Sequence, residues 1–357
     1  MMAKDKFEVK DLTGLIKEIP VQNLLITSLG FFNTKIPVNT DKFEIEKLGK
    51  VVQKPAGLFL RHGERMSTVT EDQRESVTAS MAFTASSASI YPQDFQSIRV
   101  PGSDAMETLE GVTSRRIIQL REQIALTHEE MMVASLFHNQ IPQPAGKALN
   151  LESLTGEKQQ VSEIDMAGDL LRQIEGFKRL SKDAMGALTL QCTGFTLFCP
   201  PALFDAIRYD DGLREQLLYG NQNLILGKDA LFPQDLLPQV ESFRIAGMGM
   251  RFVRMEADFT DAYLVPAFRS YAVGDFGVYT HFYGRCARNL EMAKGKAAEV
   301  FLYMQEDMRK RELFIESTFA FVNLKPSVVV KIAIKEPEPV TPSEPETPSE
   351  DEGEGTE

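Results

Sequence analysis

A segment in the first half of the chain alternates apolar and polar positions with the period of an α-helix. Between residues 104 and 139, apolar or small side chains recur at steps of three and four, with two wider gaps: Leu109, Val112, Ile117, Leu120, Ile124, Met131 and Ser135. The charged residues that take most of the other face are Arg115, Arg116, Arg121, Glu122 and Glu129. Ser103 is a suitable N-cap, and Pro142 and Pro144 end the pattern. A helix of about 35 residues would be about 50 Å long, so it must lie along an extended surface, such as a sheet edge or a neighbouring subunit.

Other patterns predict strands and shorter helices. Phe43 and Ile45 alternate with Glu44 and Glu46 in a strand over residues 42–52. Residues 64–89 are polar, rich in Ser and Thr, and have little to anchor them, so we interpret residues 46–95 as one long, poorly anchored hairpin. Further strands are expected at residues 58–61, 146–161 (a pair), 189–199, 243–255 (a pair), 313–322 and 328–334, and further helices at 11–19, 165–185 and 202–209. This irregular mixture predicts an α+β fold and not a repeated βαβ unit.

The last 22 residues differ from the rest of the chain. Residues 336–357 contain nine acidic residues, five prolines and no Lys or Arg. Such a segment has no apolar surface to bury that could offset the entropy of ordering, so we expect a disordered acidic tail. It carries nine of the twelve net negative charges, which leaves residues 1–335 nearly neutral. A nearly neutral body argues against a tightly held nucleic acid, because phosphate binding needs clustered Lys and Arg.

Composition also bears on the compartment. The chain has no run of about 18 apolar residues and no apolar core near its start, so we expect no membrane span and no signal peptide. Cys192, Cys199 and Cys286 are odd in number and lie at no motif spacing, which favours reduced, buried thiols in a cytoplasmic setting.

The candidate chemistry is weak throughout. The four histidines lie at no metal-ligand spacing from a Cys or from one another; they are His62, His128, His138 and His281. Gly247-Met248-Gly249 lacks the third glycine and the following helix of a dinucleotide site, and a hairpin turn is favoured. Asp258, Asp261 and Asp275 are interpreted as turn and cap residues, and Met248, Met250 and Met255 as core or interface filler. We therefore expect no catalytic, cofactor-binding or metal-binding residues and no enzyme activity.

A series of short motifs resembles a known family. The first are LGFF at residues 29–32, the TDKFEIE strand at 40–46, Arg61 and Gly63, FTAS at 83–86 and DFQSIR at 94–99. The next are Arg115-Arg116, LRE at 120–122, THE at 127–129 and LFCPPALFDAI at 197–207. The last are residues 262–276, 278–285, 307–313, 317–321 and 326–331. In this order, over residues 11–334, they resemble the major capsid protein E family of tailed bacteriophages, the group of the phage lambda head protein. One departure is His62, which stands between an arginine and a glycine that usually adjoin in the family.

The resemblance implies a Hong Kong 97-like capsid fold. Its parts would be an N-terminal arm (1–41), an extended loop (42–95), a peripheral domain with the long spine helix (96–185), an axial domain (186–285), a return to the peripheral domain (286–335) and the acidic tail (336–357). The implied function is a major capsid protein that forms pentamers and hexamers and closes into an icosahedral shell around packaged DNA. The alternatives are an encapsulin-like compartment shell protein and a soluble enzyme with an unrecognised site.

The resemblance also implies partners. Besides further copies of the chain, they are a portal protein, an optional decoration protein and packaged DNA held by non-specific contacts, with no membrane. The short stretch before Asp11 leaves no room for a built-in scaffolding segment, so a separate scaffolding protein is expected. The expected location is the virion, after assembly in the host cytoplasm.

Overall fold

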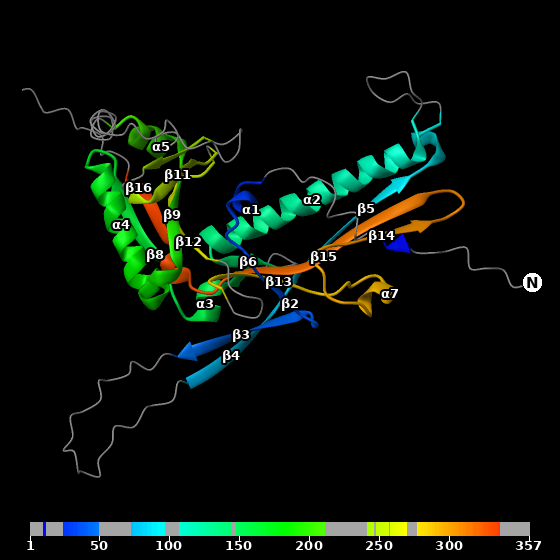
Figure 1. Cartoon of the computed structure of the whole chain (residues 1–357), viewed down its shortest axis with the longest axis horizontal. Helices are drawn as coiled ribbons and strands as arrows, with labels where there is room; N and C mark the ends of the chain where they lie inside the picture. Colours follow the sequence, from blue (N-terminus) through cyan, green and yellow to red (C-terminus); the bar gives the residue numbers. More distant parts are fainter. Residues whose placement is uncertain are drawn as a thin grey trace, which may run out of the picture.

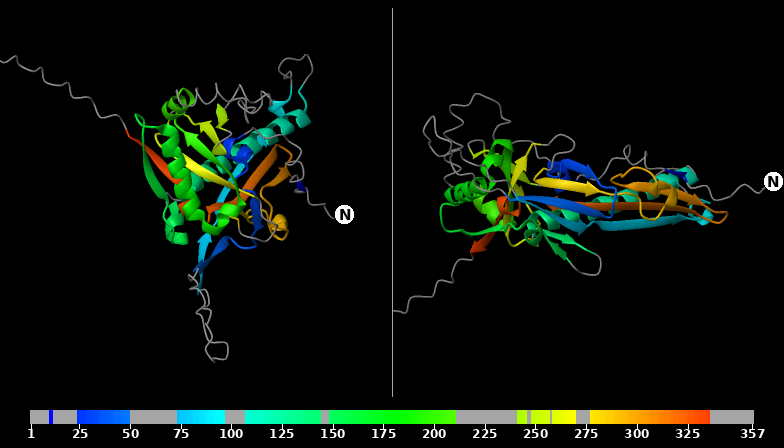
Figure 2. Two further views of the ribbon diagram at one scale, coloured as in Figure 1. Left: turned by 60° about the vertical axis from the view of Figure 1, so that its left-hand side comes forward. Right: turned by 90° about the horizontal axis from the view of Figure 1, so that it is seen from below.

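The protein is built around two six-stranded sheets. The computed structural model describes residues 10–11, 24–49, 73–96, 107–143, 148–210, 241–245, 248–256, 258–269 and 277–335. Figure 1 and the right-hand view of Figure 2 show an elongated molecule, in which one sheet and the long helix follow the long axis and the second sheet lies at one end. Helices and strands mix irregularly along the chain, which confirms the predicted α+β class.

The first sheet is organised by one long strand. Its members are β1 (Lys10–Asp11), β2 (Thr34–Pro37), β5 (Ala82–Ile90), β13 (Tyr279–Tyr283), β14 (Phe301–Glu306) and β15 (Arg311–Asn323). Strand β15 pairs along one edge with β5, from Arg311↔Ile90 to Phe319↔Ala82. Its other edge pairs first with β14 and then with β13. Both faces of β15 are largely buried, which suits its apolar and β-branched sequence.

The predicted long helix exists and covers this sheet. Helix α2 (Leu109–Phe137) has 29 residues and is therefore about 43 Å long. The apolar side chains at Val112, Ile117, Leu120 and Ile124 pack against Leu302, Leu313 and other residues of β14 and β15. The N-cap is Thr108, whose hydroxyl accepts a hydrogen bond from the Gly111 amide; the predicted cap Ser103 lies outside the described residues. Near the other end, Met132 and not Met131 is the buried methionine.

The second sheet forms the larger core. Its strands, in spatial order, are β10 (Ser242–Ile245), β11 (Met250–Arg254), β9 (Cys192–Cys199), β12 (Ala262–Phe268), β16 (Val330–Lys335) and β8 (Gln160–Asp165). Helices α4 (Leu170–Met185) and α5 (Pro201–Arg208) bury apolar stripes against it, including Ile174, Phe177 and Phe204. These elements confirm the helices and strands that the sequence predicted over residues 165–209, 243–255 and 328–334.

The remaining elements connect and extend the two sheets. They are α1 (Leu25–Leu29), β3 (Lys42–Gly49), β4 (Gln73–Ser80), β6 (Gln140–Pro142), β7 (Ala148–Asn150), α3 (Leu151–Thr155) and α7 (Leu290–Ala293), with short 3-10 helices at Pro92–Asp94, Gly186–Gln191 and Pro326–Val328. Strands β3 and β4 form a hairpin that projects from the body (Figure 1). At its base Phe43 stacks on Phe282 with ring centroids 5.0 Å apart, which confirms the predicted alternation of this strand.

Three predictions from the sequence need correction. Residues 46–95 are not one poorly anchored hairpin, because Ala82–Ile90 pairs with β15 over nine residues and lies beneath α2. Residues 146–161 are not a strand pair: β7 pairs with β6, helix α3 follows, and β8 joins the second sheet. Asp11 is not a helix cap but pairs with Tyr303 in the first sheet. The remainder of the predicted helix at 11–19 and the strand at 58–61 lie outside the described residues.

The boundaries of the predicted segments do not coincide with the division of the chain between the two sheets. Strand β8 and helix α4, from the predicted segment 96–185, pack with the second sheet, as does β16 from the segment 286–335. Strand β13, from the segment 186–285, belongs to the first sheet. The segments 186–285 and 286–335 therefore supply strands to both sheets, and the segment 96–185 packs α2 on the first sheet and supplies β8 to the second. The named division into arm, loop, peripheral and axial domains stays a prediction.

Candidate functional site

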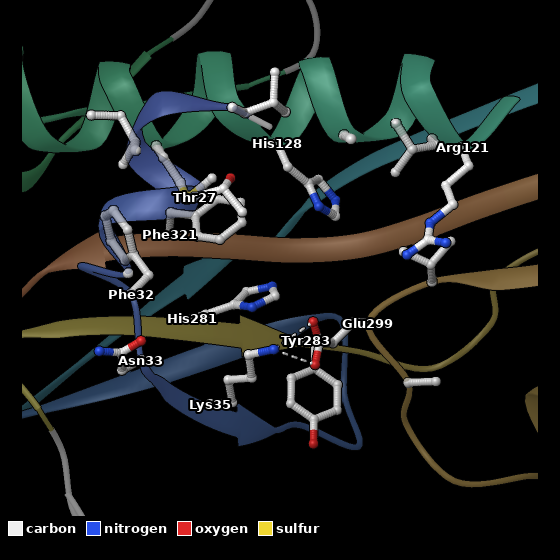
Figure 3. Close-up of a pocket in the computed structure, with 18 of the residues that line it drawn as sticks. Thr27, Phe32, Asn33, Lys35, Arg121, His128, His281, Tyr283, Glu299 and Phe321 are labelled. Carbon is white, nitrogen blue, oxygen red and sulfur yellow. Dashed lines mark hydrogen bonds and ion pairs between the residues drawn. The ribbon is translucent and has the colours of Figure 1, made fainter. Parts of the chain in front are cut away.

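The main cavity lies between the long helix and the first sheet. Its volume is about 710 Å³, it is partly open to the surface, and its wall is formed by α1, α2, β2, β13 and the segment that leads into β14. Figure 3 shows Arg121 and His128 reaching down from α2, with His281 on β13 below them. Phe32, Ile124, Ile315 and other apolar side chains form much of the remaining wall. The cavity is large enough for a small molecule or for several side chains of a partner.

Two histidines that are far apart in the sequence meet at this cavity. The ring centroids of His128 and His281 are 6.1 Å apart, and the His281 ring stacks on Phe321 at 4.4 Å. His128 Nε2 lies 3.0 Å from Ser317 Oγ, and that hydroxyl donates to the Glu299 carbonyl oxygen at 2.6 Å. Because the hydroxyl proton is used in that bond, His128 Nε2 must be the donor to Ser317. The contact therefore fixes the tautomer of the neutral imidazole.

The environment of the pair disfavours its charged form. Burial lowers the pKa of His128 to about 3, assisted by the neighbouring His281 and opposed by Glu299. Burial also lowers the pKa of His281 to about 3, with a smaller effect from Lys35. Two imidazoles that stay neutral at physiological pH, one of which has no hydrogen-bond partner at Nε2, suit the interior of a packed sheet. They lack the pKa near 7 that general acid–base catalysis favours.

Of the charged residues on the cavity wall, two form an ion pair with each other and the third does not pair with a described residue. Lys35 Nζ lies 2.8 Å and 2.9 Å from the two carboxylate oxygens of Glu299, and both side chains are about half exposed. Arg121 is partly buried, its Nη1 is shielded from solvent, and this atom has no hydrogen-bond partner in the described part of the chain. Burial lowers the pKa of the Arg121 guanidinium. The sequence pattern placed Arg121 on an exposed polar face; the structure corrects this, because the cavity wall extends round the helix to that position.

Helix α1 is held at the cavity by a carboxylate from α2. Glu129 Oε1 accepts from the Ile26 amide at 2.5 Å, and Glu129 Oε2 accepts from the Thr27 amide at 3.1 Å and from the Thr27 hydroxyl at 2.7 Å. These amides are free donors at the start of a short helix, where a negative charge is favourable. Glu129, predicted to lie on a solvated face, thus fastens α1 to the long helix.

The other described residues that were weighed as candidates for catalysis or binding lie in a turn, in the core or in an ion pair. Gly249 has φ +59° in the turn between β10 and β11, which confirms the hairpin interpretation, although Gly247 lies outside the described residues. Met248, Met250 and Met255 are buried in the core of the second sheet, as expected of filler residues. Asp261 pairs with Lys331 at 2.8 Å. His62 and Asp275 lie outside the described residues.

The thiols and the remaining histidine are also part of the packing. Cys199 and Cys286 are buried, Cys192 is partly buried, and all three are free. Burial raises the pKa of Cys286 to about 11 and lowers that of His138. Within the described ranges, no three His, Cys, Asp or Glu side chains are grouped so that they could hold a metal ion. In the same part of the chain, no helix has both the length and the apolar character needed to cross a membrane.

Sequence reasoning did not find the cavity. Its two histidines are more than 150 positions apart, and each belongs to a different element, so no local spacing could connect them. The unpaired Arg121 was visible only as one of several charges on a helix. The available signal was indirect: Arg121 directly follows the buried Leu120, at the margin of the apolar stripe.

Comparison with known proteins gives one family and a shared fold. The model of the family described as phage major capsid protein E matches residues 8–334. The crystal structure of an Escherichia coli CFT073 prophage protein, described as a capsid protein, is 11% identical with a TM-score of 0.55, and the match covers 92% of this chain and 100% of that chain. The capsid structure of cyanophage P-SCSP1u is 8% identical with a TM-score of 0.47, covering 85% and 87% of the two chains. No curated protein matches the chain significantly.

Proposed function

We propose, since the chain belongs to the phage major capsid protein E family, that it is the head protein whose copies assemble into the shell of a tailed bacteriophage. The observation that carries this conclusion is the family match, which spans residues 8–334 and so both sheets and the long helix. The fold is Hong Kong 97-like, and the role is structural and located in the virion.

The finer assignment concerns the form of the shell and the proteins that act with it. Copies of the chain form pentamers and hexamers, which close into an icosahedral shell around packaged DNA with only non-specific contacts to the nucleic acid. A separate scaffolding protein directs assembly in the host cytoplasm, a portal protein occupies one vertex, and a decoration protein is an optional addition. Family membership supports these partners, and the nearly neutral charge of residues 1–335 supports weak contact with DNA.

In such a shell, each subunit makes many individually weak contacts with its neighbours, and their energies add up. The described chain is extended, with a long helix along a sheet and a projecting β3–β4 hairpin (Figure 1). An extended subunit presents much surface to its neighbours, and large, apolar contact areas are typical of obligate assemblies. The encapsulin-like alternative is not favoured, because the matching family is one of phage capsid proteins.

Electron microscopy and sedimentation of the purified protein test the proposal. Expressed with the scaffolding protein of its own phage, the chain should form closed, hollow particles of uniform size. A sedimentation profile that shows only a stable monomer at all salt and scaffold conditions would contradict the shell function. Particles that enclose a specific enzyme cargo in place of DNA would support the compartment alternative.

A further inference from the structure

One cation on the wall of the cavity has no counter-charge among the residues that the structure describes. The charged side chains that line the cavity are Lys35, Arg121 and Glu299, and Lys35 and Glu299 pair with each other. Arg121 is left without an ion-pair partner among the described residues, and its shielded Nη1 meets no acceptor. A guanidinium stays protonated in proteins and carries only donors. A shielded donor without an acceptor is unfavourable, so a group that supplies a carboxylate at this point would be held strongly.

The surroundings of Arg121 define what kind of group fits. Ile124, Ala125, Val300 and Ile315 line the same cavity, so the occupant must combine an acidic tip with apolar flanks. A volume of about 710 Å³ accommodates several side chains and not a lone ion. A peptide segment with one Asp or Glu between apolar residues meets both requirements.

We infer that the cavity receives an acidic side chain, on an apolar segment, from a second copy of this chain when the shell assembles. The inference rests on the proposed function, because a shell surrounds every subunit with copies in fixed positions. Charge complementarity supports this occupant, because the Arg121 guanidinium, without an ion-pair partner among the described residues, lies beside an apolar wall and matches a carboxylate on an apolar segment. Arg121 would then act in assembly, where a bidentate guanidinium–carboxylate contact gives geometric specificity.

A photo-crosslinking experiment identifies the occupant directly. The photoreactive residue p-benzoyl-phenylalanine replaces Ala125, which lines the cavity one helical turn from Arg121. In the control it replaces the exposed Gln123 on the same helix. After irradiation of assembled shells, the Ala125 variant should give covalent dimers whose crosslinked peptide contains an Asp or Glu. Dissociated subunits should give none.

Three results of this experiment would overturn the inference. One is a crosslink at position 125 that stays within a single chain or joins a different protein. Another is the absence of any crosslink in intact shells. The third is the same crosslinked peptide in equal yield from position 123, which would show that the reaction reports crowding in the shell and not occupation of the cavity.

Charge variants give an independent reading of the same contact. Arg121→Glu should lower the yield of shells at least tenfold, and Arg121→Lys should retain a substantial part of the yield. Arg116→Glu, an exposed control whose side chain contacts Gln119, should assemble as the unmodified chain does. Should Arg121→Glu fail to fold, Arg121→Met removes the charge at similar length, and it should give folded subunits that assemble poorly.

The shell function and the cavity contact can be tested separately. If the unmodified chain forms no shells, the proposed function itself is wrong. If the unmodified chain forms shells and Arg121→Glu or Arg121→Met assembles equally well, only the cavity inference is wrong.

Discussion

The imidazoles of His128 and His281 lie in a part of the interior that accepts them only without charge. His281 is 4% exposed, stacks on Phe321 and has no partner at Nε2, whereas His128 donates to Ser317. The charged groups that influence the pKa values of these rings are Lys35 and Glu299, which pair with each other. Protonation of either ring would therefore place a positive charge in the packed sheet without a free carboxylate to receive it.

This arrangement predicts a loss of stability in acid. The folded pKa of each ring is about 3, below the ordinary value of about 6.5 in the unfolded chain. The unfolded state therefore binds more protons below about pH 6.5, and the stability is complete above that pH and decreases as the pH falls toward 3. Each ring contributes a slope of up to about 1.4 kcal/mol per pH unit. Denaturant unfolding of the unassembled subunit between pH 7 and pH 5 measures this slope.

A single substitution distinguishes the part of the pH dependence of stability that comes from His281 from the part that comes from carboxylates. His281→Phe keeps a ring that stacks on Phe321 and removes an unpartnered nitrogen, so it should change stability little at pH 7.5. The variant should lose the share of one ring, up to about 1.4 kcal/mol per pH unit, from the slope between pH 6.5 and pH 5, where most carboxylates stay ionised. An unchanged slope would show that the pKa of His281 is the same in the folded protein as in the unfolded chain.

At the scale of elements, the packing of the long helix can be tested by comparing a buried position with an exposed one. Leu120 is 4% exposed and packs with Leu302, Leu313 and Ile315 beneath the helix. Leu120→Ala should therefore cost about 2–5 kcal/mol in the free energy of unfolding. Arg116→Ala, on the exposed face, should cost under about 0.5 kcal/mol. Denaturant unfolding of both variants checks the phase, and equal costs would show that it is assigned wrongly.

The attachment of α1 depends on one carboxylate. Glu129 accepts bonds from the amides of Ile26 and Thr27 and from the Thr27 hydroxyl. Glu129→Ala leaves these donors without their acceptor, which should cost about 1–3 kcal/mol and should speed amide exchange at residues 24–30. Glu122→Ala, on the same helix and without a hydrogen bond to the described residues of α1, is a suitable control. Unchanged exchange over residues 24–30 in the Glu129 variant would show that packing alone holds α1.

Strand β5 gives a prediction that reverses the expectation from sequence. The Ser- and Thr-rich run suggested part of a poorly anchored hairpin, yet Ala82–Ile90 pairs along β15 and lies beneath α2. Amide exchange over residues 82–90 should consequently be slow in the free subunit as well as in the shell. Fast exchange before assembly would show that this pairing forms only between assembled copies.

The sequence predicted the elements whose pattern is local. The long helix, the strands at 189–199 and 313–322 and the hairpin at Gly249 all follow from periodicity or from a turn residue. The position of β5 could not be predicted, because small polar side chains carry no strong period and the partner strand lies more than 200 positions away. The cavity could not be predicted for the same reason. His281 and Arg121 line one cavity only because the folded sheet brings β13 and α2 together, and in the sequence Arg121 resembles any surface arginine.

For the whole molecule, the acidic tail should be independent of the folded body. The family match ends at residue 334 and the last strand ends at Lys335. Deletion of residues 336–357 removes nine acids and no large apolar cluster, so the Tm should change by less than about 4 °C, the shift expected from about 1 kcal/mol. Calorimetry of the truncated and complete chains measures the difference. A larger fall would show that the tail packs on the body.

The place of β16 in the second sheet has a consequence for the order of events during translation. Strand β8 pairs only with β16 among the described strands, and the two are separated by about 165 residues. At roughly 5–20 residues per second, the ribosome needs on the order of ten to thirty seconds to supply that partner. Throughout this time β8 has no strand beside it, and the second sheet is incomplete. We therefore expect a chain that is truncated before β16 to lack a complete second sheet and not to enter the shell.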